Sequence, residues 1–273
     1  MKDFSMLISV YKNEKAEHLK QCFDSVAQQT LQPTEIVLVE DGPLTPQINE
    51  AIEQEQQRFN NILRVKLERN SGLGTALREG LKVCHYDIVA RMDADDICQP
   101  QRFELQMQHL EAHPDVDVIS SWIAEFYDSP DNIIAIRDLP EEHADIYEFG
   151  KIRNPINHPA VMFRRQAVID AGSYQPFPLF EDYYLWARML NGGNRFHNIQ
   201  QPLLLFRRSS QMMHRRGGWR YAKNEILFQR ALHEMGYITA WRMTKNIILR
   251  YGIRLVPNSV RSWIYSRFLR RQF

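Results

Sequence analysis

The feature that most constrains the fold is the alternation of apolar, strand-like runs with amphipathic, helix-like runs through the first half of the chain. After the first apolar run, for example, apolar side chains recur at helical spacing over residues 19–26. Strands that alternate with helices are joined by right-handed crossovers, so the pattern predicts a mostly parallel sheet flanked by helices. The strands predicted in this half cover residues 6–11, 35–40, 63–67 and 87–92.

The second half is less regular but carries the same kinds of signal. Beyond residue 206 the chain has helical spacing and many basic residues. The sequence therefore predicts an α/β domain over residues 1–206 and a basic, mainly helical C-terminal region over residues 207–273. The other elements predicted are helices near residues 73–81, after Pro100 and over 180–190, and strands over 116–123, 160–163 and 202–206.

The net charge of +1 conceals a strong asymmetry. Residues 203–273 hold 15 Lys and Arg but two Asp and Glu, whereas the rest of the chain holds 19 basic and 31 acidic residues. An acidic body favours a cation site, and a basic C-terminal region favours an anionic partner. We expect that partner to be a membrane surface rather than a nucleic acid, because the acidic body would repel a polyanion.

Cysteines and apolar runs indicate the compartment. The three cysteines are widely spaced and form no C-x-x-C pair, so neither a zinc site nor a disulfide framework is predicted, and a reducing compartment fits. We see no signal peptide before the first strand, and no apolar run approaches the roughly 18 residues that a membrane span needs. We expect a cytoplasmic protein held peripherally on the inner face of the cell membrane.

An amphipathic segment near the C-terminus could make that membrane contact. Residues 241–273 hold eight Lys and Arg and no acidic residue. After Pro257, apolar side chains follow at helical spacing, and the neighbouring arginines can extend toward lipid headgroups. The alternative is that this helix packs its apolar stripe against the α/β domain of residues 1–206. The stripe consists of Val260, Trp263, Ile264 and Phe268.

Two acidic clusters follow predicted strands. Alternation at a strand end can direct both Asp93 and Asp95 toward one ion, and Mg²⁺ or Mn²⁺ prefers hard oxygen ligands. The same residues equally suit an acidic turn before the helix at Pro100. Asp41 ends the second strand, so we expect it beside Asp93, where it could accept a hydrogen bond from a nucleobase or ribose. An ordinary Asp-Gly turn is the alternative.

The remaining polar motifs each have a functional and a structural interpretation. Glycines over residues 70–74 could let the backbone approach a nucleotide, or could simply begin a helix. Glu181 and Asp182 could supply a general base, or could be favoured by a helix dipole. His158 could face a phosphate or sugar, or could lie in the core. The basic segment 214–218 could offer a metal ligand and phosphate-binding arginines, or could be a solvated loop.

The order of these motifs is more specific than any of them alone. It resembles the order in the family 2 glycosyltransferases, over about residues 4–208, and implies their Rossmann-like GT-A fold with the basic region as an extension. Segments 154–163 and 215–218 are similar to the bacterial branch that builds O-antigen and exopolysaccharide repeats, the amylovoran-type enzymes. The motifs that carry the family resemblance are residues 9–11, 28–30, 35–41, 70–72, 91–96 and 181–182.

The resemblance implies a UDP-sugar donor and Mn²⁺ or Mg²⁺ as cofactor. It implies that Asp41 contacts the uracil, that Asp93 faces the ribose or the metal, and that Asp95 ligates the metal. Asp182 would be the catalytic base, and His214 stands several residues later than a further metal-ligating histidine found in many relatives. The implied donor-binding residues are Ser9, Tyr11, Asp41, Asn70, Gly72, Arg91 and Asp93. The implied acceptor or phosphate contacts are His158, Glu181, Arg215 and Arg216.

The reaction implied is an inverting, metal-dependent transfer of a hexose, with galactose or glucose favoured, to a sugar carried on a polyprenyl diphosphate. The acceptor could instead be lipopolysaccharide core or another glycan. A nucleotidyltransferase would show a basic, Gly-rich loop after the first strand, which residues 9–14 lack. A glycoside hydrolase would use two carboxylates and water without a metal cluster. A nucleic-acid-binding module is a further alternative, because the basic region interleaves aromatic residues with arginines.

Overall fold

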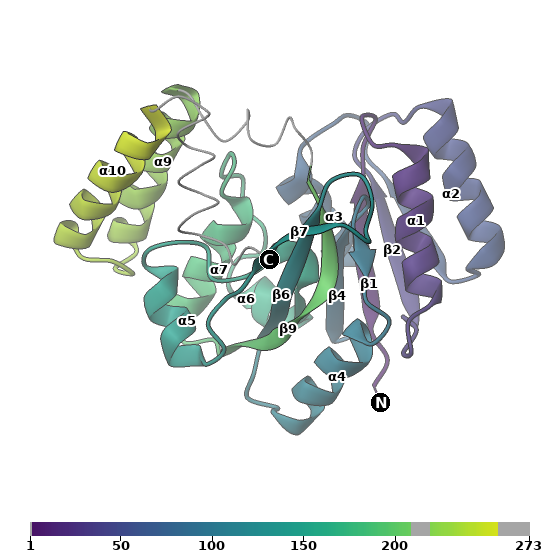
Figure 1. Cartoon of the computed structure of the whole chain (residues 1–273), viewed down its shortest axis with the longest axis horizontal. Helices are drawn as coiled ribbons and strands as arrows, with labels where there is room; N and C mark the ends of the chain where they lie inside the picture. The colour runs from purple at the N-terminus through teal and green to yellow at the C-terminus, as the bar shows by residue number, and fades with distance from the viewer. Residues whose placement is uncertain (1, 209–218, 256–273) are drawn as a thin grey trace.

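The computed structural model describes residues 2–208 and 219–255 and contains a nine-stranded sheet within them (Figure 1). The strand order is β3-β2-β1-β4-β8-β6-β9-β5, and β7 pairs with β6. The strands are β1 (Ser5–Val10), β2 (Glu35–Glu40), β3 (Ile62–Lys66), β4 (Ile88–Asp93), β5 (Ile97–Cys98), β6 (Val118–Phe126), β7 (Ile133–Arg137), β8 (Met162–Arg164) and β9 (Phe196–Arg207).

Helices cover both faces of this sheet. Side chains along β1 alternate between the two layers, with Leu7 in the core of α3 and α7 and with Met6 and Ile8 in the core of α1, α2 and α4. The helices are α1 (Ala16–Ala27), α2 (Pro46–Arg58), α3 (Leu73–Val83), α4 (Arg102–Ala112), α5 (His143–Gly150), α6 (Arg165–Asp170), α7 (Glu181–Asn191), α9 (Trp219–Glu234) and α10 (Ala240–Leu255), with a 3₁₀ turn at His158–Ala160.

The first half of the chain forms the parallel part of the sheet, as the strand and helix alternation predicts. β1 pairs in parallel with both β2 and β4, and β2 pairs in parallel with β3. The central strands are buried on both faces, which explains their nearly continuous apolar sequence. The four strands predicted in this half agree with the structure to within a residue or two at each end.

The second half makes the sheet mixed. The short strand β8 runs antiparallel between β4 and β6, and β9 then runs parallel to β6. β9 begins at Phe196, six residues before the predicted start at residue 202, and its register against β6 shifts near Trp122. The elements that were not predicted from the sequence are α2, α5, α6, β5 and β7.

The two C-terminal helices lie side by side (Figure 1) and share a core with α7. Phe228 on α9 stacks on Phe180 with ring centroids 4.7 Å apart and lies 4.6 Å from the ring of Tyr183. α9 and α10 therefore pack as a continuation of the core of α7. The predicted stripe at residues 260–268 lies outside the described residues.

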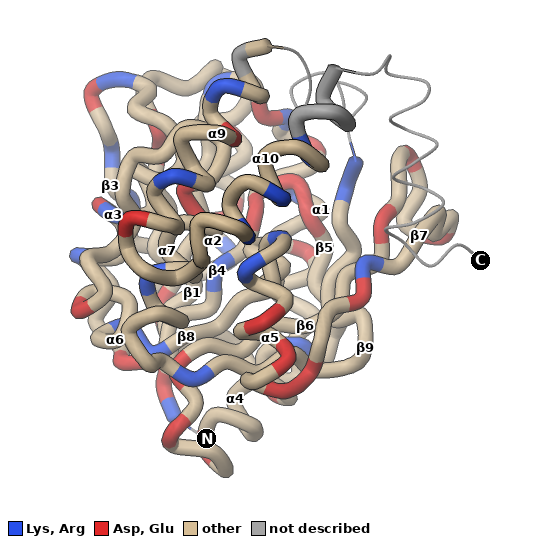
Figure 2. Tube along the Cα trace, turned by 90° about the vertical axis from the view of Figure 1, so that its left-hand side faces the viewer, with Lys and Arg blue, Asp and Glu red and all other residues tan. Residues whose placement is uncertain are grey.

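No helix within residues 2–208 and 219–255 has the length and apolar character needed to cross a membrane. Lys and Arg lie along both α9 and α10 (Figure 2), and α10 contains no Asp or Glu.

Candidate active site at the carboxyl ends of the parallel strands

The structure brings the predicted donor-binding residues to one edge of the sheet. Register places Ser9 opposite Asp93 and Val10 opposite Glu40, so β1, β2 and β4 all end there. β1 lies between the other two strands, which corrects the expectation that Asp41 lies beside Asp93. Two strand spacings separate them, about 10 Å, so the two carboxylates serve different parts of one site.

Asp41 fixes the loop that begins α3. Its carboxylate accepts hydrogen bonds from the Asn70 side chain at 3.0 Å, from the Ser71 backbone N–H at 2.7 Å and from the Gly72 backbone N–H at 3.0 Å. The residue is 4% exposed. Of the roughly four lone-pair positions on a carboxylate, at least three are thus already used. Asp41 shapes the loop at this edge, whether or not it also contacts a nucleobase.

Gly42 adds a second constraint on the same loop. Its φ is +84°, in the left-handed region that favours glycine. A Cβ at this position would stand 2.4 Å from the backbone nitrogen of Asn70, which is closer than real side chains approach. The Asp41-Gly42 turn and the 70–72 loop are therefore packed backbone to backbone.

Arg91 is the buried cation of the site. It is 1% exposed, and its guanidinium forms a two-pronged ion pair with the carboxylate of Asp93, two residues further along β4. Burial has the largest effect on three residues near Arg91, since it raises the pKa values of Glu181 and Tyr174 and lowers that of His158. The charge of Arg91 has a smaller effect, which acts to lower all three pKa values. Arg91 on β4 therefore lies close enough to the start of α7 for its charge to act on Glu181.

The turn after β4 concentrates negative charge. Burial and the charge of Asp93 raise the pKa of Asp95 to about 6. Asp96 is fully buried; one of its carboxylate oxygens accepts from the backbone N–H of Arg207 at 2.8 Å, and the other has no hydrogen-bond partner among the described residues. The Arg207 side chain also donates to the Asp95 carbonyl at 2.9 Å, so β9 holds this acidic turn in place.

The start of α7 supplies two further carboxylates. A Cβ on Gly74 would lie 3.2 Å from the Cβ of Glu181, so the first turns of α3 and α7 are in contact. Burial and the charge of Asp182 raise the pKa of Glu181 to about 6. One oxygen of Asp182 accepts a hydrogen bond of 2.7 Å from the side-chain amide of Asn154.

His158 lies in the interior, which agrees with the structural interpretation of this residue. It is 7% exposed, and its Nε2 lies 2.9 Å from the hydroxyl of Tyr174. Burial lowers its pKa well below the ordinary value, and the charge of Arg91 lowers it further. A neutral, enclosed imidazole does not suit a direct contact with a diphosphate.

The remaining predicted residues divide into two groups. Ser9 and Tyr11 are half-buried, and Asn70 and Gly72 are exposed, all at the same edge of the sheet. His214, Arg215 and Arg216 lie outside the described residues.

Several residues that contact the predicted site residues were not predicted from the sequence. Tyr174 and Arg207 carry no local signal, because their partners are far away in the chain. Asp96 lies in the acidic motif of residues 91–96, but its partner Arg207 is 111 residues away. For Asn154, the local indication is its Asn-Pro step, which is a turn signal.

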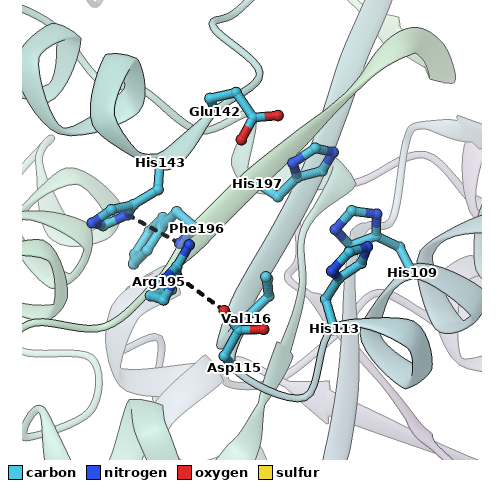
Figure 3. A pocket seen from close by; sticks show the side chains of 9 residues that line it. All are labelled: His109, His113, Asp115, Val116, Glu142, His143, Arg195, Phe196 and His197. Carbon is cyan, nitrogen blue, oxygen red and sulfur yellow. Dashed lines mark hydrogen bonds and ion pairs between the residues drawn. The ribbon is translucent and has the colours of Figure 1, made fainter.

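A pocket of about 190 Å³ lies at the opposite end of the sheet, beside the amino ends of β6 and β9 (Figure 3). The rings of His109 and His197 stack with centroids 4.0 Å apart, and His113 lies 4.4 Å from His109. Burial lowers the pKa of His109 to about 4, with smaller effects from His197 and His113. This histidine cluster is not part of the candidate active site. The other residues that line the pocket are Asp115, Val116, Glu142, His143, Arg195 and Phe196.

Comparisons with known proteins agree with this architecture. A sequence model of the glycosyl transferase family 2 matches residues 5–171. An amylovoran biosynthesis glycosyltransferase, AmsE, of Erwinia amylovora is 41% identical over 97% of this chain and 98% of its own length. A UDP-Gal:alpha-D-GlcNAc-diphosphoundecaprenol beta-1,3-galactosyltransferase of Escherichia coli is 37% identical over 98% of this chain and 97% of its own length.

A solved structure supports the predicted GT-A-like fold. Residues 1–349 of S. aureus TarS in complex with UDP-GlcNAc superpose with a TM-score of 0.69 at 17% identity, covering 97% of this chain and 79% of that one. At this identity the likeness concerns the fold alone. It confirms the α/β class predicted from the sequence.

Proposed function

Because the chain belongs to glycosyl transferase family 2, we propose that it transfers a hexose from a UDP-sugar to a sugar carried on a polyprenyl diphosphate. The chain is a glycosyltransferase, and what we propose is its donor, its acceptor and its mechanism. The galactosyltransferase of Escherichia coli, which matches over nearly its whole length, supports by its activity both the UDP-sugar and the lipid-linked acceptor. Galactose is the favoured sugar, with glucose as the alternative.

The observation that carries this proposal is that two pairs of carboxylates lie near Arg91 at the same edge of the sheet. Asp93 ends β4 and Asp95 lies in the turn after it, whereas Glu181 and Asp182 begin α7. Sugar transfer requires stabilisation of an anionic leaving group and removal of a proton from the acceptor hydroxyl. A site with a carboxylate pair for a cation and a separate carboxylate for the proton can provide both.

The acidic turn after β4 fits a divalent cation. The pKa of Asp95 is raised because this carboxylate is buried beside Asp93, and a bound cation would relieve that repulsion. Among the described residues, no group of three or more His, Cys, Asp or Glu is arranged to hold a metal ion. Two carboxylates together with substrate phosphates are a usual set for Mg²⁺ or Mn²⁺, so Asp95 and Asp93 would hold it. When bound, the cation would neutralise charge that grows on the diphosphate.

Asp182 is proposed as the general base. It lies at the start of α7, and its Oδ2 accepts a hydrogen bond from the Asn154 side chain. The other oxygen can accept the proton of the acceptor hydroxyl as that hydroxyl attacks the sugar. A single displacement inverts the anomeric centre, so an α-linked donor gives a β-linked product.

The exposed face of α10 is proposed to contact the cytoplasmic face of the membrane. Trp241, Ile248 and Leu249 are 77%, 67% and 56% exposed and recur at helical spacing, and Arg242 and Lys245 lie beside them. Exposed Trp and aliphatic side chains next to cations suit an anionic lipid surface. A peripheral position would bring the enzyme to a lipid-linked acceptor.

We also propose that Arg215 and Arg216 contact the diphosphate of the acceptor.

Vesicle co-sedimentation tests this contact. The full chain should bind anionic vesicles at low salt, and the paired substitution W241S and I248S should weaken that binding. L63S, which changes an exposed apolar residue on the edge strand β3, should leave it unchanged. Equal sedimentation of all three proteins would contradict the proposal, and salt-dependent binding to RNA instead would favour a nucleic-acid-binding module.

A donor screen tests the reaction. UDP release should be measured for a panel of UDP-sugars, with and without a synthetic lipid-diphosphate N-acetylglucosamine acceptor. We expect UDP-galactose to give the largest acceptor-dependent release. Release with lipopolysaccharide core but not with the lipid diphosphate would favour the alternative acceptor, and absence of release with every donor would contradict the proposal.

A further inference from the structure

The loop after α5 connects the proposed base to the C-terminal helices. We propose that Asn154 is a positioning residue for Asp182 and that α10 holds Asn154 in place. This inference rests on the proposed role of Asp182 in sugar transfer.

Asn154 uses both ends of its side-chain amide. Its Nδ2 donates to Oδ2 of Asp182 at 2.7 Å, and its Oδ1 accepts from the backbone N–H of Ile156 at 3.2 Å. The second bond fixes which end of the amide faces Asp182, because a backbone N–H can only donate. The amino group is therefore directed at the carboxylate and orients it.

The backbone just before Asn154 is held by three side chains. The carbonyl of Gly150 accepts from the Tyr183 hydroxyl at 2.7 Å, and the carbonyl of Lys151 accepts from the Asn246 side chain at 2.9 Å. The carbonyl of Ile152 accepts from the Arg250 guanidinium. Three consecutive carbonyls are thus bound by side chains, two of which come from α10.

The α10 side chains are themselves fixed from a second direction. Arg250 forms an ion pair with Glu225 of α9, whose side chain is 3% exposed. Asn246 also donates to the Gln229 side chain at 2.9 Å. Burial alone would lower the pKa of Arg250, but the nearby charge of Glu225 raises it above the ordinary value. A buried pair of this kind resists opening, because separation would leave a charge buried without a partner.

This arrangement extends the support of the proposed base from α7 to the C-terminal helices. A general base must lie within hydrogen-bond reach of the proton that it removes, and a small displacement is costly to the rate. The chain of contacts from α10 through residues 151–154 restrains Asp182 from outside its own helix. The C-terminal helices therefore contribute to catalysis without contacting substrate.

The substitution N154D tests the hydrogen bond directly. It keeps an oxygen for the Ile156 N–H but replaces the donor by a carboxyl group. At neutral pH we expect kcat to fall by about 10- to 100-fold, the range for one hydrogen bond to a charged group, with the donor KM unchanged. The deficit relative to wild type should shrink as the pH is lowered, because the introduced carboxyl then gains a proton and can donate again.

Two comparisons decide the result. If D182N is inactive while N154D retains full turnover, or if N154D lowers kcat and raises the donor KM together at all pH values, the positioning role is refuted. If D182N itself keeps wild-type turnover, both this inference and the proposed role of Asp182 fail.

Variants of α10 test the second half of the inference. N246A should lower kcat in the same direction as N154D but by less, and should be non-additive with it in a double-mutant cycle. T244A changes an exposed residue on the same helix and should have no effect on kcat. If N246A behaves like T244A, with unfolding temperatures matched, the contribution of α10 is refuted.

Discussion

Replacing Gly42 by alanine would test whether the Asp41 turn and the 70–72 loop act as one unit. The substitution has two costs. An L-residue at φ +84° costs about 1 to 2 kcal/mol. The added Cβ would also stand 2.4 Å from a backbone nitrogen of Asn70, and backbone must move to relieve this contact, at about 1 to 3 kcal/mol by comparison with overpacked cores. We expect a loss of about 2 to 5 kcal/mol in unfolding free energy or an equivalent displacement of the loop.

Gly193 offers a matched control for the conformational cost alone. Its φ is +92°, and a Cβ there would meet nothing within 4 Å. Chemical denaturation should show that G42A is the more destabilising by at least about 1 kcal/mol. Calorimetric binding of UDP should be weakened by G42A and unaffected by G193A. Equal destabilisation by the two variants, or undiminished UDP affinity in G42A, would refute the close-packing argument.

Three further predictions concern the proposed chemistry and the histidine cluster. Addition of EDTA, or the substitution D95A, should abolish most transfer, because several kcal/mol of leaving-group stabilisation is lost; full activity under either condition would exclude the metal. D182N should reduce turnover by roughly 10²- to 10⁴-fold with UDP-sugar binding retained; near-normal turnover would place the base elsewhere, with Glu181 as the next candidate. Since the pKa of His109 is lowered to about 4 against an ordinary value of about 6.5, the unfolded chain binds more protons between these values. The unfolding temperature should therefore fall as the pH is lowered through this range, and it should fall less steeply in H109Q. Parallel curves of unfolding temperature against pH for the two proteins would contradict this.

The parallel strands were predictable because burial on both faces gives them an unambiguous local pattern. Residues 36–39 of β2 are all buried and apolar, and the turn at Asp41-Gly42 ends the run. α2 was missed for the opposite reason, since its buried side chains are Ile48, Ile52 and Glu55 in an otherwise polar helix. Its start did carry a signal, because Thr45 caps the helix before Pro46.

The relative positions within the site depended on topology rather than on local sequence. Local pattern indicates that β1, β2 and β4 are parallel, but only the assembled sheet shows that β1 lies between the other two. The distance between Asp41 and Asp93 follows from that order. Likewise, Asn154 and Asp182 are 28 residues apart, and nothing in either segment indicates the other. Pairing between distant segments is decided by packing of the whole chain, which short motifs do not report.

The packing of the C-terminal helices changes how the charge asymmetry should be understood. A basic region attached by a linker could bind an anionic partner without affecting the reaction at the active site. Here Phe228 of α9 is stacked in the core of α7, and Arg250 of α10 reaches the carbonyl of Ile152. The same helix exposes Trp241 and Ile248 on its outer side. The same helix therefore carries the proposed membrane-contacting face on its outer side and the proposed support of Asp182 on its inner side, so that the packing of α10 would couple the two proposals.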